Sequence, residues 1–274
     1  MSDAGSRPRT VLICHHDAPL HTDGLARWLA SWSDFAGLVI IEEPPGLIRK
    51  RLRRERKRVG LLRLADVVAQ RVYYRLTSAA RDSAWIGRQL TALRQQFPVA
   101  PRVPTVRVPT PNSADAQRLL HTARPDLVLA LCKNILAERI FAIPAHGTFV
   151  LHPGICPEYR NSHGCFWALA SNDLDKVGMS LLRIDRGIDT GPVFGYFTTS
   201  YDEVSESHIV IQHRMTLDNL DGIAALLGRI HAGLAEPVDT RGRASHEWGQ
   251  PWLSKYLYWK RQARRRRRDA SHHA

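Results

Sequence analysis

Four short apolar runs, each closed by a polar or proline-containing turn, recur along the chain. They are Thr10–Cys14, Gly37–Ile41, Leu127–Leu131 and Thr148–Leu151. Apolar runs of this length between turn residues are typical of buried strands. A helical pattern after the first run returns the chain along the sheet, as parallel pairing requires. The sequence therefore predicts an α/β fold: a Rossmann-like, open, mostly parallel twisted sheet flanked by helices.

The stretch 47–97 differs from its surroundings because it contains no proline and its apolar residues recur at three- and four-residue steps. This spacing predicts helices, and we interpret the stretch as a basic helical insertion beside the sheet. Its first part reads RKRLRRERKR at residues 49–58. Shaping an acceptor site, binding a partner and acting as a structural lid all remain open as roles for it.

The net charge of +13 is concentrated in the block 49–58 and in the five arginines Arg264–Arg268. Basic blocks attract nucleic-acid phosphates, anionic substrates or acidic membrane surfaces. A solvated helix face and a disordered tail are the alternative interpretation. Nucleic-acid binding is not the favoured one, because the tail has no aromatic residue after Trp259 on which bases could stack.

The expected organisation is one α/β domain at residues 10–240 that includes the insertion, after a disordered segment 1–9. Residues 241–274 are expected to form an aromatic and basic extension, with a disordered tail from about 260. No apolar run approaches the roughly 18 residues that cross a bilayer, and no secretory signal opens the chain. The four cysteines have no disulfide-like spacing. These features predict a cytoplasmic protein without a transmembrane segment.

Acid and base side chains follow two of the predicted strands. The run Thr148–Leu151 ends at His152, and a second strand over Gly178–Ile184 leads into the segment from Asp185 to Asp189. In open α/β sheets, ligands bind beyond the carboxyl ends of the strands. We therefore expect the histidine and the aspartates to converge on one crevice as an acid/base site.

Two motifs in this region carry a family resemblance. HPGICPEYR begins at His152, and D-x-G-I-D-T-G-P-V begins at Asp185. In this order and separation they resemble the folate-dependent formyltransferase family, which includes glycinamide ribonucleotide, methionyl-tRNA and nucleotide-sugar formyltransferases. The resemblance covers residues 124–200 and implies catalytic roles for His152 and Asp189. The family's catalytic asparagine is replaced here by Val150.

The resemblance implies transfer of a formyl group from 10-formyltetrahydrofolate to an amine of a small-molecule acceptor, an amino sugar or a nucleotide-linked amine being the expected kind. It assigns folate binding to Ile135, Leu136, Asp185 and Ile188. It assigns acceptor binding to Tyr159, Arg160, Asn161 and His163. The remainder after Val238 is too short for the barrel that methionyl-tRNA formyltransferases append, which argues against initiator tRNA as the acceptor.

An asparagine amide aimed at the developing oxyanion contributes about 3 to 4 kcal/mol, and a valine side chain has no such donor. Val150 therefore leaves alternatives open. Asn134, Asn161 or His163 could replace it, or the chain could perform altered chemistry. One alternative is a hydrolase or deacylase with a metal in the loop that holds His15, His16, Asp17, His21 and Asp23. Another is a catalytically silent protein that binds RNA or another anion. The set His152, Cys156, His163 and Cys165 matches no zinc spacing, so no metal ligand is assigned.

Overall fold

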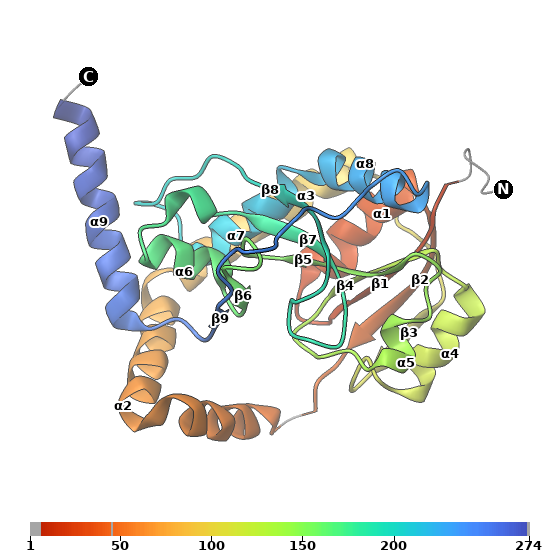
Figure 1. The fold of residues 1–274 in the computed structure, drawn as a ribbon, viewed down its shortest axis with the longest axis horizontal. Coiled ribbons are helices and arrows are strands. Elements are labelled where there is room, and N and C mark those ends of the chain that lie inside the picture. Colours follow the sequence, from red (N-terminus) through yellow and green to blue (C-terminus); the bar gives the residue numbers. More distant parts are fainter. Residues whose placement is uncertain (1–6, 45, 273–274) are drawn as a thin grey trace.

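A seven-stranded sheet forms the centre of the protein, in a computed structural model that describes residues 7–44 and 46–272. The strands lie in the order β3-β2-β1-β4-β5-β7-β8 (Figure 1). Their bounds are β1 Arg9–His15, β2 Asp34–Ile41, β3 Thr105–Val108, β4 Leu127–Leu131, β5 Gly147–His152, β7 Met179–Arg183 and β8 Val193–Phe197. The pairs among β1 to β5 are parallel, while β7 and β8 are antiparallel. The predicted mostly parallel α/β fold is confirmed.

Helices cover both faces of this sheet (Figure 1). They are a π-helical turn η1 Leu20–Leu25, α1 Ala26–Trp32, α2 Leu47–Thr77, α3 Ala79–Gln96, α4 Ala114–Ala123, α5 Glu138–Phe141, α6 Gly164–Ala170, a 3₁₀ turn η2 Leu174–Lys176, α7 His208–Leu217, α8 Leu220–His231 and α9 Leu253–His272. A separate pair of two-residue strands joins β6 Arg160–Asn161 to β9 Glu247–Trp248.

Successive strand residues point to opposite faces, which divides the core in two. In β1, Leu12 and Cys14 belong to the larger core under α1, α6, α7, α8 and α9. Val11 and Ile13 belong to the smaller core under α4 and α5. Both faces of the strand are therefore buried, and this explains why the parallel strands read as continuous apolar runs.

The strand order reverses direction between β1 and β4. From β1 the chain builds outward through β2 and β3, and it then returns to lay β4 and β5 on the other side of β1. At this point the backbone N–H of Lys133 donates to Nε2 of His15 over 3.1 Å. Such a switch point is where open α/β sheets form a ligand crevice, because the connections diverge there.

The insertion consists of α2 and α3, and Gly60 interrupts α2 with a φ of 78°. A positive φ is readily adopted by glycine, which has no Cβ, so the kink falls there. Of the basic block 49–58, only the side chains of Arg56 and Lys57 lie within the described residues, and both are exposed. Among residues 7–44 and 46–272, no helix combines the length and apolarity needed to cross a bilayer.

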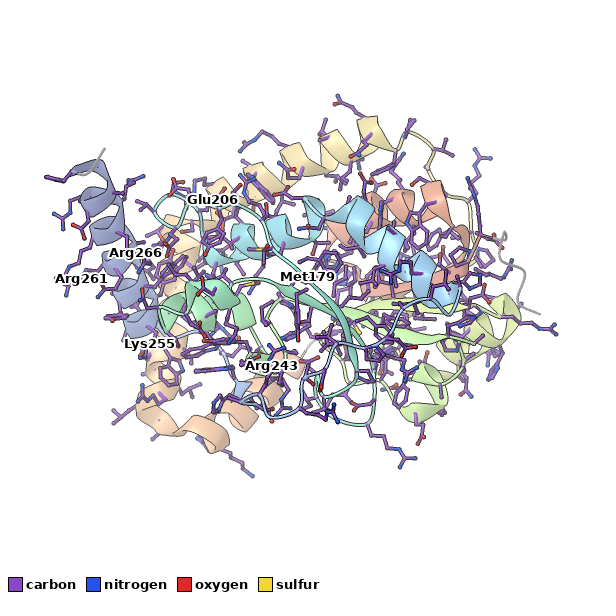
Figure 2. The ribbon with its side chains drawn as sticks, turned by 45° about the horizontal axis from the view of Figure 1, so that its top comes forward. Met179, Glu206, Arg243, Lys255, Arg261 and Arg266 are labelled. Carbon is purple, nitrogen blue, oxygen red and sulfur yellow. The ribbon has the colours of Figure 1, made fainter. Side chains whose placement is uncertain are left out.

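Two elements differ from the expectations. The apolar stripe of Ile209–His231 predicts a single long helix. The structure divides it into α7 and α8, because the Asn219 side chain donates to the carbonyls of Met215 and Thr198 at the break. The tail expected to be disordered from about 260 is part of α9. Arg266 on α9, labelled in Figure 2, pairs with Glu203 over 2.6 Å.

Candidate active site

A buried histidine and an aspartate meet at the carboxyl end of β5. Nδ1 of His152 lies 3.2 Å from Oδ2 of Asp189, and Nε2 of His152 lies 2.7 Å from the carbonyl oxygen of Tyr159. Both ring nitrogens thus face acceptors. A neutral imidazole can donate to one of them, whereas the protonated ring can donate to both. The structure brings together the two residues expected in one crevice.

The path of the chain that places Asp189 here was not predicted from the sequence. Because β7 is antiparallel to β5, its end at Arg183 pairs with Phe149 and lies away from His152. The loop 184–192 then turns back, and Asp189, with a φ of 51°, faces the imidazole. The expectation that both strands end at the same edge of the sheet was therefore wrong, although the two side chains do converge.

Hydrogen bonds from β6 fix the loop that holds Asp189. The backbone N–H of Asn161 donates to Oδ2 of Asp189 over 2.8 Å, and Nη1 of Arg160 donates to the carbonyl of Ile188 over 2.8 Å. The side-chain amide of Asn161 donates in turn to the carbonyl of Trp248 over 2.6 Å. Asn161 and Arg160, expected to contact the acceptor, therefore position the carboxylate.

The carboxylate of Asp185 forms its hydrogen bonds within the same loop. Its carboxylate accepts from the backbone N–H of Gly187 over 2.9 Å and from the Thr190 hydroxyl over 2.8 Å. Short-range bonds of this kind stabilise a turn. The half-buried Ile188 lies between Asp185 and Asp189. Asp185 thus shapes the loop that the resemblance assigns to the folate pocket.

The segment after β4 carries the other two residues assigned to folate. The Ile135 side chain is exposed, whereas Leu136 is buried and belongs to the smaller core with Ile140. Asn112 holds this backbone, since its amide donates to the carbonyl of Ile135 and accepts from the N–H of Ala137. From the sequence alone, Asn112 and Ser113 are expected to form a helix cap, and the contact of Asn112 with this backbone is not predicted. Ser113 alone caps α4, by accepting from the N–H of Ala116.

An ion pair joins the two segments. Arg186, in the loop after β7, forms a bidentate contact with Glu138, which follows Leu136 by two positions. Both side chains are largely exposed, so the pair adds little stability. It does show that the residues assigned to folate from β4 and from the loop after β7 lie on the same part of the molecule.

The remaining residues assigned to the acceptor are enclosed. Tyr159 is buried, its hydroxyl donates to Asp173 over 2.8 Å, and its ring stacks on Trp248 with centroids 5.6 Å apart.

Val150, at the position of the family's asparagine, packs in an apolar cluster with Leu182. The Asn161 amide is occupied by β9, whereas Oδ1 of Asn134 is buried and has no hydrogen-bond partner among the described residues.

Four further imidazoles form two ring pairs. The ring of His163 lies 5.6 Å from that of His208, and the ring of His21 lies 6.3 Å from that of His213. Burial lowers the pKa of His163 and of His213 to about 4, and burial with the neighbouring His213 lowers the pKa of His21 to about 3. Burial also holds the pKa of His208 well below its ordinary value. At neutral pH these rings are uncharged.

These histidines predict a loss of stability in mild acid. In the unfolded chain they gain protons near pH 6.5, but in the folded protein His163 and His213 stay neutral to about pH 4. Between these values the unfolded state binds more protons, so the free energy of unfolding falls as pH falls. Each ring contributes at most about 1.4 kcal/mol per pH unit.

Urea midpoints at pH 7, 6 and 5 measure this effect. A His208→Phe variant removes one titrating ring and fits the aromatic surroundings of Phe166 and Tyr256, so its midpoint should depend less on pH. Wild-type midpoints that do not change between pH 7 and pH 5 would contradict the interpretation.

The two alternative metal sets are not assembled. Asp23 is paired with Arg27 and Arg94, and His15 accepts from Lys133. Burial raises the pKa of both the Cys156 and the Cys165 thiol to about 12. Within the described part of the chain, neither the loop around His15 nor the His152 and Cys156 set forms a group of three side chains within ligand distance.

Comparisons with known proteins find similarity to formyltransferases. Residues 86–208 match the family model described as formyl transferase. The methionyl-tRNA formyltransferase of Thermotoga neapolitana is 28% identical over 147 residues, covering 51% of this chain and 45% of that protein. That of Nitrosomonas eutropha is 33% identical over 102 residues, covering 37% of this chain and 31% of that protein. The chain thus matches less than half the length of these relatives.

Solved structures share the fold at low identity. A sugar N-formyltransferase from a Shewanella species has a TM-score of 0.51 at 12% identity, covering 88% of this chain and 76% of that one. Phosphoribosylglycinamide formyltransferase from Anaplasma phagocytophilum has a TM-score of 0.51 at 15% identity, covering 88% and 98%. The α/β fold of this chain is therefore one that solved formyltransferases share. Over residues 86–208, less than half of its length, the chain is similar to the formyl transferase family.

Proposed function

We propose that this protein transfers a formyl group from 10-formyltetrahydrofolate to an amine of a small-molecule acceptor. The observation that carries the proposal is the contact of 3.2 Å between Nδ1 of His152 and Oδ2 of Asp189, inside the segment that matches the family. A buried imidazole whose orientation is fixed by a carboxylate is the arrangement that general acid/base chemistry needs.

In the proposed reaction a neutral amine attacks the formyl carbon, and a new C–N bond forms. The tetrahedral intermediate then expels N10 of the folate, which takes up a proton. The oxyanion would replace the Tyr159 carbonyl as the partner of Nε2 of His152, so that this N–H stabilises the developing charge. Asp189 orients the imidazole through Nδ1 and accepts the amine proton, directly or through one water.

The folate is proposed to lie between the segment of Ile135 and Leu136 and the loop from Asp185 to Ile188. Their proximity, through the Arg186–Glu138 pair, supports a shared pocket. The backbone of the first segment would contact the pterin, since the Leu136 side chain is in the core. Among the acceptor residues, His163 is the proposed contact, because Tyr159, Arg160 and Asn161 have intramolecular partners.

Val150 cannot supply the amide that the family resemblance expects, so another donor must stabilise the oxyanion. Asn134 is the proposed replacement, since its buried Oδ1 lacks a partner and an amide can reorient around a bound ligand. Without any replacement, transfer should be slower by about 10²- to 10³-fold.

The proposed acceptor is a small amine that carries negative charge. The net charge of +13 attracts anions, and the neighbouring structures include sugar and phosphoribosylglycinamide formyltransferases. Methionyl-tRNA is the second candidate, because relatives such as those from Thermotoga neapolitana and Nitrosomonas eutropha are methionyl-tRNA formyltransferases. Amino sugars, nucleotide-linked amines and methionyl-tRNA therefore belong in one acceptor panel.

The test measures 10-formyltetrahydrofolate consumption over that panel, together with binding of a non-reactive folate analogue by calorimetry. Binding of the analogue and turnover with at least one amine is the expected outcome. A protein that neither binds the analogue nor consumes the donor would refute the proposal.

A further inference from the structure

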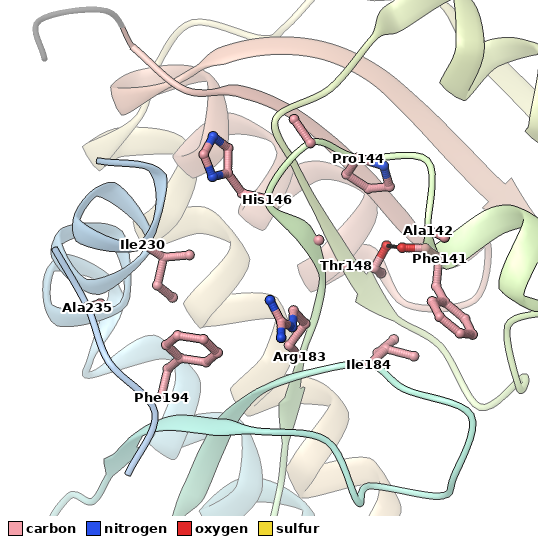
Figure 3. Close-up of a pocket in the computed structure, with 12 residues that line it drawn as sticks. Phe141, Ala142, Pro144, His146, Thr148, Arg183, Ile184, Phe194, Ile230 and Ala235 are labelled. Atoms are coloured by element: carbon pink, nitrogen blue, oxygen red, sulfur yellow. Dashed lines mark hydrogen bonds between the residues drawn. The ribbon is translucent and has the colours of Figure 1, made fainter. Parts of the chain in front are cut away.

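A second cluster of chemically active side chains lies at the opposite end of the sheet from His152. Asp126 directly precedes β4, His146 directly precedes β5, and His231 ends α8. Figure 3 shows His146 beside a cavity of about 410 Å³ that Arg183 and Ile230 also line. β5 separates this cluster from the candidate active site, so the formyl-transfer mechanism does not use it.

The three side chains are arranged as a ligand set. One potential ligand atom from each of Asp126, His146 and His231 lies within 4.8 Å of the others. The two imidazole rings are 5.1 Å apart at 75°. Two imidazoles and one carboxylate, with a position left for water, are a common ligand set for zinc.

The distances within the cluster suit a bridging ion better than direct hydrogen bonds. Nδ1 of His231 lies 3.9 Å from Oδ2 of Asp126, which is too long for a hydrogen bond. Nδ1 of His231 is also buried without a hydrogen-bond partner among the described residues. In a tetrahedral zinc site with bonds of 2.0 to 2.1 Å, two ligand atoms are about 3.3 Å apart. The ligand atoms, now within 4.8 Å of one another, must therefore approach by up to about 1.5 Å when an ion binds.

The backbone holds two of the ligands in place before any ion binds. The N–H of His146 donates to the carbonyl of Asp126 over 2.8 Å, which fixes these residues across adjoining parallel strands. Oδ2 of Asp126 accepts from the N–H of Arg9 over 2.7 Å. A carboxylate held by a hydrogen bond keeps its orientation toward a metal, and such support strengthens metal binding.

The cluster is also accessible. The side chains of His231 and Asp126 are 17% and 29% exposed, so an ion and a water ligand can enter from solvent. Arg183 at the adjoining cavity would attract an anion that replaces the water. The ligands, their support and an entry path are the features that a metal site requires.

We propose that Asp126, His146 and His231 form a zinc site at the amino ends of β4 and β5. No metal ligand was expected from the sequence, and no short motif contains this set, because its members lie far apart in the chain: before β4, before β5 and at the end of α8. The site does not depend on the proposed formyl transfer. It ties the end of α8 to two central strands, so an ion bound there stabilises the native fold.

Zinc titration of the metal-free full-length protein tests the proposal. Calorimetry should give one strong site per chain, and Co²⁺ should give the visible absorption of a four-coordinate ion. Zinc at about 100 times its dissociation constant should raise the unfolding temperature by about 5 °C. His231→Ala and His146→Asn should each weaken binding at least about 100-fold, with circular dichroism confirming that the variants are folded.

The matched control is His272→Ala, which removes an exposed histidine on α9 that could bind zinc by itself. This variant should bind zinc as the wild type does. The proposal is wrong if the wild type binds no zinc, if His231→Ala binds equally well, or if His272→Ala abolishes binding.

Discussion

Replacing Asp189 by asparagine is expected to lower kcat for formyl transfer by about 10²- to 10⁴-fold, with little change in KM. Both Asn161 and His152 contact the same oxygen, Oδ2 of Asp189, so an asparagine whose Oδ1 takes that place can keep both contacts. The amide is uncharged, however, so it neither stabilises a protonated imidazole nor accepts the proton of the amine. Steady-state kinetics with the best acceptor of the panel measure the effect.

Asp221→Asn is the matched control, since Asp221 is an exposed aspartate in the first turn of α8. It should leave kcat unchanged. Equal activity of wild type and Asp189→Asn would mean that the buried pair has a structural role only. Urea unfolding of both variants separates a catalytic loss from a loss of folded protein.

Replacing Trp259 by alanine is expected to lower the free energy of unfolding by about 3 to 5 kcal/mol. The side chain is fully buried in the larger core and packs at right angles to Tyr256. Its Nε1 also donates to Glu203 over 2.9 Å, a bond that alanine cannot make. Urea denaturation, followed by circular dichroism, gives the change.

The neighbouring Tyr258 supplies the comparison, because it is 48% exposed on the other side of α9. Tyr258→Ala should change the free energy of unfolding by no more than about 0.5 kcal/mol. If α9 were detached from the domain, the two substitutions would have equal and small effects. That result would mean that α9 does not pack on the larger core.

The strands could be predicted because the parallel strands are buried on both faces and therefore appear as apolar runs. The run Thr148–Leu151 lies within β5, and the run Leu127–Leu131 is β4. The meeting of His152 and Asp189 was also foreseen, but for an incomplete reason. Local patterns do not specify whether a strand is parallel or antiparallel, so the return of the loop 184–192 could not be inferred.

The contacts that were missed join residues far apart in the chain. Asn219 breaks the expected long helix partly through the carbonyl of Thr198, and Asn112 holds the backbone of Ile135 from another element. In α9, the buried residues Tyr256, Trp259 and Ala263 recur at helical spacing. The arginine run that follows them led to the expectation of a disordered tail instead. Propensity and periodicity are local measures, whereas each of these features depends on a partner that only the fold supplies.

The pairing of β6 with β9 bears on how this protein could be dissected. The family match ends at residue 208, yet the carbonyl of Trp248 holds Asn161, whose N–H holds Asp189. A graft of the matched segment alone into another scaffold would carry a carboxylate without its anchor. A minimal working unit must therefore include β9, and exchanging the C-terminal region for a different module would require that module to supply an equivalent strand.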